Sequence, residues 1–449
     1  MNDICFFARE PIGSSTYPLP DQPVDIDKTL STLKAVTNQK KSILYIHVPF
    51  CDQICSFCGF TRLIGKESMK DAYVNALIHE IRMYAQLEYI QSLGVSSVFL
   101  GGGTANSLSA KHLDTILASI KANFTLDIDC QITCEGTPQN FTEDRIEVLK
   151  RHNVSRVSAG IQTFNKEIRT EHLRMNYGKY ELLGHIENIR KHFSDFNIDM
   201  IYNFPDQTDT IWDDDLNTAI GSGATHLTIY PLVLLEGTAF YSDYVKKQKY
   251  PAPDHEREIA LFKHTVNTLR NTAYEKYSVN DWAFPQHESR YITLDAESID
   301  VIGLGAVAHG YLGGMVYKNI QSPKEYIDFI SRKSYLPISR QRYLSERDKM
   351  DRHMVMGLRL DNLDLSSFER TYGRKAQDVY AAQIADMCES GYLKLRDDHL
   401  VFTDEGLVWA NNVRSYFERE KVSCVGYSDT TGIGQSGKDH YGEIAMHKA

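Results

Sequence analysis

The sequence lacks the features that would place a protein in a membrane or outside the cell. No apolar run approaches the ~20 residues that are needed to cross a bilayer. The N-terminus, MNDICFFAREPIGSS, has no basic stretch followed by an apolar one, so it does not resemble a secretory signal. We therefore expect a cytoplasmic protein without a membrane span.

Positive charge is also scarce. The 449 residues contain 49 Lys and Arg against 59 Asp and Glu, which gives a formal net charge of −10. Nucleic acids and anionic membrane surfaces would repel such a chain, so we expect no nucleic-acid partner. The hydrophobic fraction of 42% is that of an ordinary globular protein, and the length suits roughly two or three domains.

Cysteine is sparse too, but it is unevenly spread. Three of the eight cysteines fall within eight residues, in the segment YIHVPFCDQICSFCGF, and have C-x3-C-x2-C spacing. In a reducing compartment such spacing favours metal binding or catalysis over disulfides. The other five are scattered, and we expect them to be small buried side chains: Cys5, Cys130, Cys134, Cys388 and Cys424.

Three thiolates on one loop can hold one metal centre. A structural zinc site needs a fourth ligand, for which the nearest candidate is His47, in the preceding strand. Iron–sulfur clusters usually take four cysteines, so a loop with three leaves one iron open to a substrate or cofactor. The spacing favours such a cluster, with zinc as the alternative.

A repeating pattern of strands and helices starts at residue 42. Short β-branched or aromatic runs predict six strands, at Ile43–Val48, Val95–Leu100, Cys130–Glu135, Arg156–Ile161, Asn197–Tyr202 and Thr225–Tyr230. Amphipathic segments between them predict helices at Lys70–Leu87, Ala110–Asn123, Thr142–His152, Gly178–Phe193 and Thr210–Ser222. This alternation predicts a parallel α/β sheet, open or barrel-like, with ligands at the C-terminal ends of the strands.

The rest of the chain has a different pattern. Residues 1–41 are polar and aperiodic, and we expect an extended N-terminal arm. From about residue 341 an Arg- and Met-rich helix (Glu346–Leu358), two more helical segments (Ser366–Tyr372 and Ala376–Ser390), a hairpin, and a helix capped by Thr403 predict a small winged-helix-like domain. The expected division is arm 1–41, core 42–340, accessory domain 341–422 and a disordered tail 423–449.

The cysteine motif after the first strand resembles that of the radical S-adenosylmethionine (SAM) superfamily. The wider string YIHVPFC…CSFCGF is similar to the oxygen-independent coproporphyrinogen III oxidase subgroup, and the similarity extends from about Ile43 to Phe417. It implies a partial (β/α)6 barrel and a [4Fe–4S] cluster on Cys51, Cys55 and Cys58. The open iron would bind SAM, and one electron from a donor such as flavodoxin or ferredoxin would cleave SAM to a 5′-deoxyadenosyl radical.

Further motifs match the same subgroup, among them GGGT (Gly101–Thr104), GIQTFN (Gly160–Asn165) and NIDMIYNFPDQ. The resemblance implies two SAM molecules. Tyr45, Gly102 and Glu135 would contact the first, and a second set would contact the other: Phe57, Gly103, Thr104, Gln162, Arg174 and Asp199. Val233 and His309 complete the implied cofactor-binding set. From the residues alone, GGGT could be a plain turn, Glu135 a solvated strand end, and Arg174 and Asp199 a mutual salt bridge.

Departures from the oxidase pattern narrow the resemblance. Phe60 stands where the oxidases have a fourth cysteine, and the haem chaperones of the subgroup have C-D-F where this chain has C-G-F. The C-terminal strings MVMGLRLDNLDLSSFERTYG and LVFTDEGL still favour a relative of the porphyrin enzymes. The chain is most similar to the anaerobic haem-utilisation radical SAM methyltransferases. This resemblance implies methyl transfer to haem, opening of the macrocycle and release of iron. The oxidase and the non-catalytic haem chaperone remain alternatives.

One histidine could act on the porphyrin itself. His309 lies in the glycine turn GLGAVAHG, where the oxidases have an apolar residue and the chaperones also have a histidine. Its imidazole could ligate haem iron or donate a proton to the opening macrocycle. Alternatively, it only lines the SAM pocket. His287 and His226 are weaker candidates.

Overall fold

Six parallel strands form the centre of the molecule. The computed structural model describes residues 4–6, 9–10, 16–33, 40–251, 254–333 and 335–418, so the predicted tail and Cys424 lie outside the described residues. Each central strand pairs with the next in chain order: β1 (Lys40–Val48), β2 (Leu93–Gly102), β3 (Leu126–Gly136), β4 (Arg156–Gln162), β5 (Asp195–Tyr202) and β6 (His226–Pro231). All six predicted strands are confirmed.

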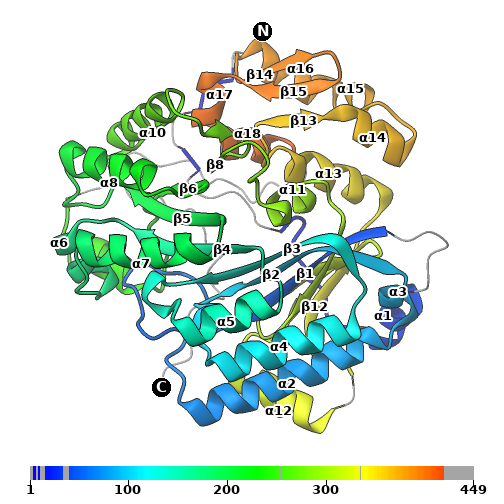
Figure 1. Ribbon diagram of the computed structural model, residues 1–449. Helices are drawn as coiled ribbons and strands as arrows, with labels where there is room; N and C mark the ends of the chain where they lie inside the picture. Colours follow the sequence, from blue (N-terminus) through cyan, green and yellow to red (C-terminus); the bar gives the residue numbers. More distant parts are fainter. Residues whose placement is uncertain are drawn as a thin grey trace.

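The predicted helices cover the outer face of this curved sheet (Figure 1). They are α2 (Glu67–Ala85), α4 (Ala110–Asn123), α5 (Glu143–Arg151), α7 (Lys179–His192) and α8 (Asp209–Gly221). Side-chain caps fix where two of them begin, because Ser109 accepts a hydrogen bond from the His112 amide and Thr208 from that of Ile211. The predicted α/β partial barrel is confirmed.

The sheet is wider than the sequence pattern indicated. Among the described residues it has twelve strands, in the order β12-β11-β10-β9-β1-β2-β3-β4-β5-β6-β8-β7. The added strands have two to six residues, too few for a clear period: β7 (Glu275–Lys276), β8 (Asp281–Ala283), β9 (Asp300–Leu304), β10 (His309–Leu312), β11 (Met315–Asn319) and β12 (Ile338–Tyr343). The expected boundary between core and accessory domain, at 340/341, falls inside β12 and stays a prediction.

The N-terminal arm is attached to the body rather than simply extended. It contains a short helix, α1 (Ile26–Thr32), which the sequence pattern did not indicate and which Asp25 caps. Gln22 forms an isolated antiparallel bridge with Gln341 of β12, and buried Arg9 forms an ion pair with Glu258 at 2.8 Å. These contacts place the arm against both the core and its extension.

The C-terminal segment forms helices and a separate small sheet, as predicted. The helices are α13 (Glu346–Gly357), α14 (Leu365–Tyr372), α15 (Ala376–Val379), α16 (Ala381–Glu389), α17 (Asp404–Val408) and α18 (Ala410–Tyr416), and β13 (Asn362–Asp364), β15 (His399–Phe402) and β14 (Leu393–Arg396) form the sheet. The helix expected at Ala376–Ser390 is interrupted at Tyr380, whose hydroxyl donates to Asp351 at 2.7 Å.

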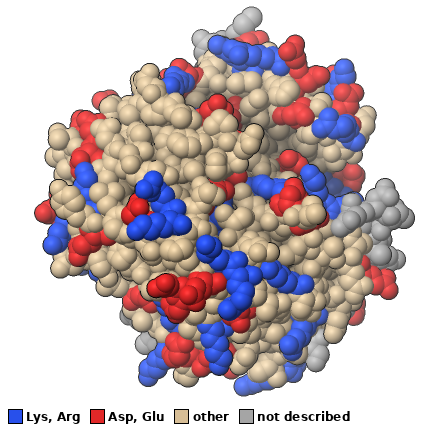
Figure 2. All heavy atoms as spheres, viewed as in Figure 1, with Lys and Arg blue, Asp and Glu red and all other residues tan. Residues whose placement is uncertain are grey.

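The remaining helices connect these parts. They are α3 (Glu88–Gln91), α6 (Lys166–Ile168), α9 (Ala239–Tyr241), α10 (His255–Leu269), α11 (Arg290–Ala296) and α12 (Pro323–Arg332), with single turns at η1 (Ala105–Ser107), η2 (Pro138–Asn140), η3 (Arg169–Leu173) and η4 (Ser242–Lys246). Within the described ranges every helix is too short or too polar to span a bilayer. On the face shown in Figure 2, basic and acidic side chains are interspersed.

Candidate cluster and cofactor site

The C-terminal ends of the parallel strands surround one large cavity. Its volume is about 1510 Å³, above the ~300–1,000 Å³ of ordinary small-molecule sites. Nearly all of the site residues expected from the sequence line it: Tyr45, Cys51, Cys55, Phe57, Cys58, Gly102, Gly103, Thr104, Glu135, Gln162, Asp199, Val233 and His309. The fold therefore brings together residues that are up to 264 positions apart in the sequence (Tyr45 to His309).

The cysteine loop follows β1 and is tied down at both ends. The Cys51 amide donates to the Leu63 carbonyl at 3.0 Å, and the Leu63 amide donates to Pro49 at 2.8 Å. In the middle of the loop, the Ser56 amide donates to the His172 carbonyl at 2.9 Å, and the Ser56 carbonyl accepts from the Phe240 amide at 2.8 Å. The three thiols are thus presented to the cavity by a fixed backbone.

The thiols suit an iron–sulfur cluster chemically. All three are free of disulfides and half-buried. Burial raises the pKa of Cys51 to about 11 and that of Cys55 to about 12, and it raises the pKa of Cys58 as well. Thiols of this kind stay protonated at neutral pH until a metal displaces the proton, so cluster binding releases protons.

The spacing of the sulfurs argues against a single zinc ion. Four thiolates around one zinc lie about 3.8 Å apart, given Zn–S bonds of ~2.3 Å. Among the described residues, only Glu67, Asp71 and His112 bring three ligand atoms within 4.8 Å of one another. The three cysteine sulfurs are therefore more widely spread, as ligands of different irons in a cluster need to be.

The GGGT turn lies directly against the cysteine loop. A Cβ at Gly103 would stand 2.9 Å from the Cys51 sulfur and 2.9 Å from the Phe50 carbonyl oxygen. Gly102 has φ +115°, and a Cβ there would approach Val48 O within 2.8 Å. The Thr104 hydroxyl donates to the Cys51 sulfur at 3.4 Å. The glycines are required both for the turn and for close approach to the cluster ligands.

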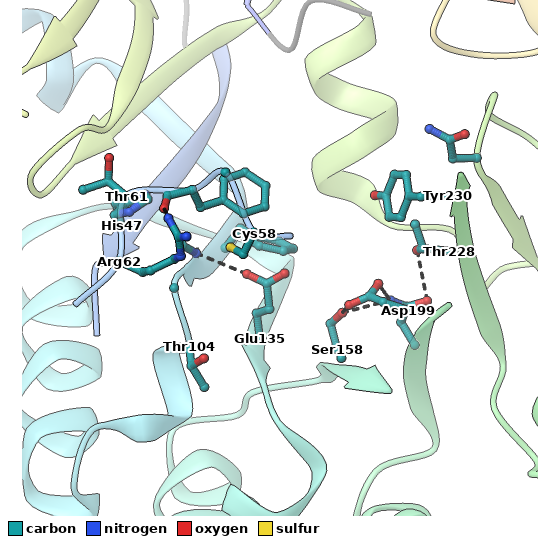
Figure 3. A pocket seen from close by; sticks show the side chains of 18 of the residues that line it. His47, Cys58, Thr61, Arg62, Thr104, Glu135, Ser158, Asp199, Thr228 and Tyr230 are labelled. Carbon is teal, nitrogen blue, oxygen red and sulfur yellow. Dashed lines mark hydrogen bonds between the residues drawn. The ribbon is translucent and has the colours of Figure 1, made fainter. Parts of the chain in front are cut away.

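Two carboxyls face the same space (Figure 3). Glu135 at the end of β3 accepts from the Gly102 amide at 3.2 Å, and Asp199 on β5 accepts from the Asn197 side chain at 2.7 Å. Burial, and then the neighbouring Asp199 charge, raise the pKa of Glu135 to about 8, and burial raises the pKa of Asp199 to about 6. Ionising these two buried carboxyls costs free energy. A ligand with an ammonium or sulfonium group would offset that cost by pairing with the carboxylates.

His309 opens β10 and also faces the cavity. No described residue forms a hydrogen bond with its ring. Burial, then Lys318 and His47, lower the pKa of His309 to about 3, which keeps the imidazole neutral. A neutral ring with free nitrogens is the form that binds metal. By contrast, His226 is held between Asn197 and Tyr277, each at 2.7 Å, and is not available as a ligand in this arrangement. His287 lies 3.7 Å from Asp195, outside the set of lining residues.

Arg174 is the exception among the expected site residues. It is exposed, has φ +59°, and does not line the cavity. Among the described residues no ion pair joins it to Asp199, so the salt-bridge alternative is not found either. Its assignment to a SAM carboxylate stays a prediction that this arrangement does not support.

Several lining residues were not found from the sequence. They include Arg62, Arg156, Asp281, Asp295, Arg352, Arg359 and Arg414. The arginines of the C-terminal segment had one weak signal, the Arg-rich composition of the helix at 346–358, which does not indicate the direction of any side chain.

Comparison with known proteins agrees with this geometry. Residues 45–219 match the model of the radical SAM superfamily, and residues 344–409 match that of the HemN C-terminal domain. Coproporphyrinogen III oxidase (HemN) of Escherichia coli, a radical SAM enzyme, superposes with a TM-score of 0.77 at 22% identity and covers 88% of this chain and 94% of its own. At that identity the match shows the fold.

Two relatives are similar over most of their length. Heme chaperone HemW of Lactococcus lactis is 26% identical over 387 residues, which are 86% of this chain and 99% of the relative. Anaerobilin synthase of Escherichia coli O157:H7 is 26% identical over 400 residues, 87% of this chain and 88% of the relative. From the cysteine loop and the two domain matches together, the chain contains a radical SAM domain followed by a HemN C-terminal domain, and its cofactors are a [4Fe–4S] cluster and SAM.

Proposed function

We propose that this protein binds haem or a related porphyrin in the cavity beside the cluster and acts as a haem chaperone. The observation that carries the proposal is the cavity itself, one space of about 1510 Å³ that is lined both by the cluster cysteines and by His309. This volume exceeds that of ordinary small-molecule sites, so it has room for a large ligand in addition to SAM. His309 supplies a neutral imidazole that can face haem iron.

The chaperone role is favoured over catalysis by the similarity to proteins with that name. HemW proteins of Lactococcus lactis and Bacillus subtilis align over 99% and 98% of their own length. When bound, the cluster and SAM supply one-electron radical chemistry, which a chaperone can retain without consuming haem. The sequence departs from the chaperone pattern at Gly59, which stands in place of aspartate after Cys58 and itself lines the cavity.

Anaerobic haem degradation is the second candidate. One observation favours it, namely that most residues assigned to a second SAM line the cavity: Phe57, Gly103, Thr104, Gln162 and Asp199. A methyltransferase needs that second SAM as the methyl donor, and one relative is named anaerobilin synthase. Coproporphyrinogen oxidation has less support, because Phe60 replaces the fourth cysteine of the oxidases.

One experiment separates these functions. Reconstituted protein would be incubated anaerobically with haem, SAM and a strong reductant, and the pigment would be analysed by mass spectrometry. A chaperone returns intact haem with no stoichiometric loss of SAM, whereas a degrading enzyme yields a methylated linear tetrapyrrole with SAM consumed in proportion. Coproporphyrinogen in place of haem tests the oxidase, whose product has lost carboxyl groups. Failure to bind any of these pigments would overturn the proposal.

The proposal also includes an electron donor and a cellular location. The cluster needs a low-potential electron donor, for which flavodoxin or ferredoxin is the proposed class, and the proposed location is the cytoplasm. Pull-down of reduced flavodoxin and the rate of cluster reduction with it would test the first.

A further inference from the structure

Three arginines converge on the part of the cavity wall that the C-terminal segment forms. Arg352 lies on α13, Arg359 just after it, and Arg414 on α18. The helix α11 packs against α13, and α13 against α18, over the open end of the barrel (Figure 1). All three arginines line the same cavity as the cluster cysteines.

Two of these cations, Arg352 and Arg414, are buried, and Arg359 is partly buried. Arg352 is 2% and Arg414 5% exposed. Asp295 on α11 forms ion pairs with Arg359 and, at 3.8 Å, with Arg352. Burial, and then the charge of Arg359, lower the pKa of Arg414 to about 9, although Glu418, Glu10 and Asp295 act in the opposite direction. Repulsion between buried arginines is costly, and a bound anion would relieve it.

Neutral acceptors are among the partners that orient Arg352 and Arg414. Arg352 donates to the Tyr17 carbonyl at 2.6 Å and lies 4.4 Å from the centre of the Tyr311 ring. Its Nε is buried and has no hydrogen-bond partner among the described residues. Arg414 donates to the Val355 carbonyl at 3.1 Å and to the Asn411 side chain at 3.2 Å. Such bonds fix the orientation of Arg352 and Arg414, and Asp295 is the one carboxylate that pairs with Arg352 and Arg359 in the ion pairs given above, so the three guanidinium groups are preorganised for an anion.

We propose that Arg352, Arg359 and Arg414 bind the carboxylates of the ligand in this cavity, which for haem are its two propionates. The inference rests on the proposed function and adds to it a recognition site on the C-terminal domain. Guanidinium groups pair with carboxylates through two parallel hydrogen bonds, which fixes the orientation of the ligand as well as its affinity. The site would therefore select porphyrins with free carboxylates over neutral ones.

The test compares haem with its dimethyl ester, which has the same iron and macrocycle but no anionic carboxylates. Both would be titrated anaerobically into the full-length, cluster-loaded protein, together with SAM as a separate arm. We expect the parent to bind haem at least tenfold more tightly than the ester. Arg352→Gln and Arg414→Gln should lower haem affinity toward that of the ester and leave ester affinity unchanged. Arg270→Gln, which is half-exposed and pairs with Asp404 at a distance from the cavity, is the matched control.

The outcomes are distinguishable. Equal binding of haem and ester by the parent would overturn the carboxylate site while the proposed function stood, and this measurement needs no variant to fold. Variants that keep the full preference for haem would overturn it as well. If the variants lost SAM affinity while their preference for haem was unchanged, the carboxylate would be that of SAM, and the inference would be wrong. Binding of neither pigment would overturn the proposed function and the inference together.

Discussion

The two parts of the cavity wall are encoded in different ways. The part with the cysteines comes from contiguous motifs, since the three thiols lie within eight residues and the GGGT turn adds four consecutive ones. The part with the arginines comes from residues 62 positions apart, on two helices and the segment between them. Here the cluster ligands share one short loop, whereas the arginines are brought together only by the fold.

This difference sets the limit of what the sequence could predict. The six central strands and their helices were found because each has a clear period of hydrophobicity, and the cysteines because their spacing is specific. Of the flanking strands, β9 was indicated by the short apolar run Val301–Leu304, and the others were missed because they are short. The arginines were missed because a helix rich in charge is usually a solvated one. Arg174 was assigned from a motif, but its left-handed backbone conformation turns the chain at the surface.

The largest effect is expected on the cysteine loop. Cys51→Ala, Cys55→Ala and Cys58→Ala should each abolish cluster assembly and reductive cleavage of SAM, because the remaining thiols cannot hold the cluster. Iron and sulfide content and the yield of 5′-deoxyadenosine are the measurements. Cys130→Ser and Cys388→Ser, whose thiols do not line the cavity, are the controls and should retain the cluster. Full cleavage activity in any of the three alanine variants would show that the ligand set is wrong.

A second prediction concerns the contact between α2 of the barrel and the β10–β11 hairpin that contains His309. Buried Glu80 on α2 accepts hydrogen bonds from the Tyr326 hydroxyl (2.5 Å), the Gly305 amide (2.7 Å) and the Asn319 side chain (2.7 Å). Glu80→Ala leaves these buried donors without an acceptor and should lower the free energy of unfolding by about 3 kcal/mol or more. Urea denaturation measures this loss. Glu80→Gln keeps the shape of the neutral side chain and should lose much less.

The same carboxyl predicts a pH dependence. Burial raises the pKa of Glu80 to about 7, so between pH 5 and 8 the unfolded chain releases a proton that the folded one retains longer. Its contribution to stability should therefore fall as pH rises, by roughly 2 to 3 kcal/mol over this range. Glu80→Gln should remove that part of the slope. Parallel stability profiles for parent and variant would contradict the assignment.

A smaller effect is expected at His309, which lines the same cavity as the cysteines and the arginines. If its neutral imidazole ligates haem iron, His309→Ala should change the Soret absorption and lower haem affinity by about tenfold, or ~1.4 kcal/mol. Anaerobic haem titration followed by absorption spectroscopy measures both, with exposed His79→Ala as the control. An unchanged Soret band with unchanged affinity would rule out ligation, and intact turnover of haem would rule out a proton-donor role.

The smallest effect concerns the local stability of the C-terminal domain, which carries the arginines of the cavity wall. The Thr403 hydroxyl accepts from the Gly406 amide at 2.9 Å and donates to the Gly391 carbonyl at 2.7 Å, so it caps α17 and ties it to the turn before β14. Thr403→Ala should cost about 1 kcal/mol, while Thr403→Ser keeps the cap and should be nearly neutral. Amide hydrogen exchange shows which residues lose stability in the Thr403→Ala variant. Faster exchange confined to residues 362–416, with the barrel unaffected, would show that the two parts unfold separately and that the arginine site can open while the cluster stays in place. A uniform increase across the barrel would show instead that one cooperative unit carries both parts of the wall.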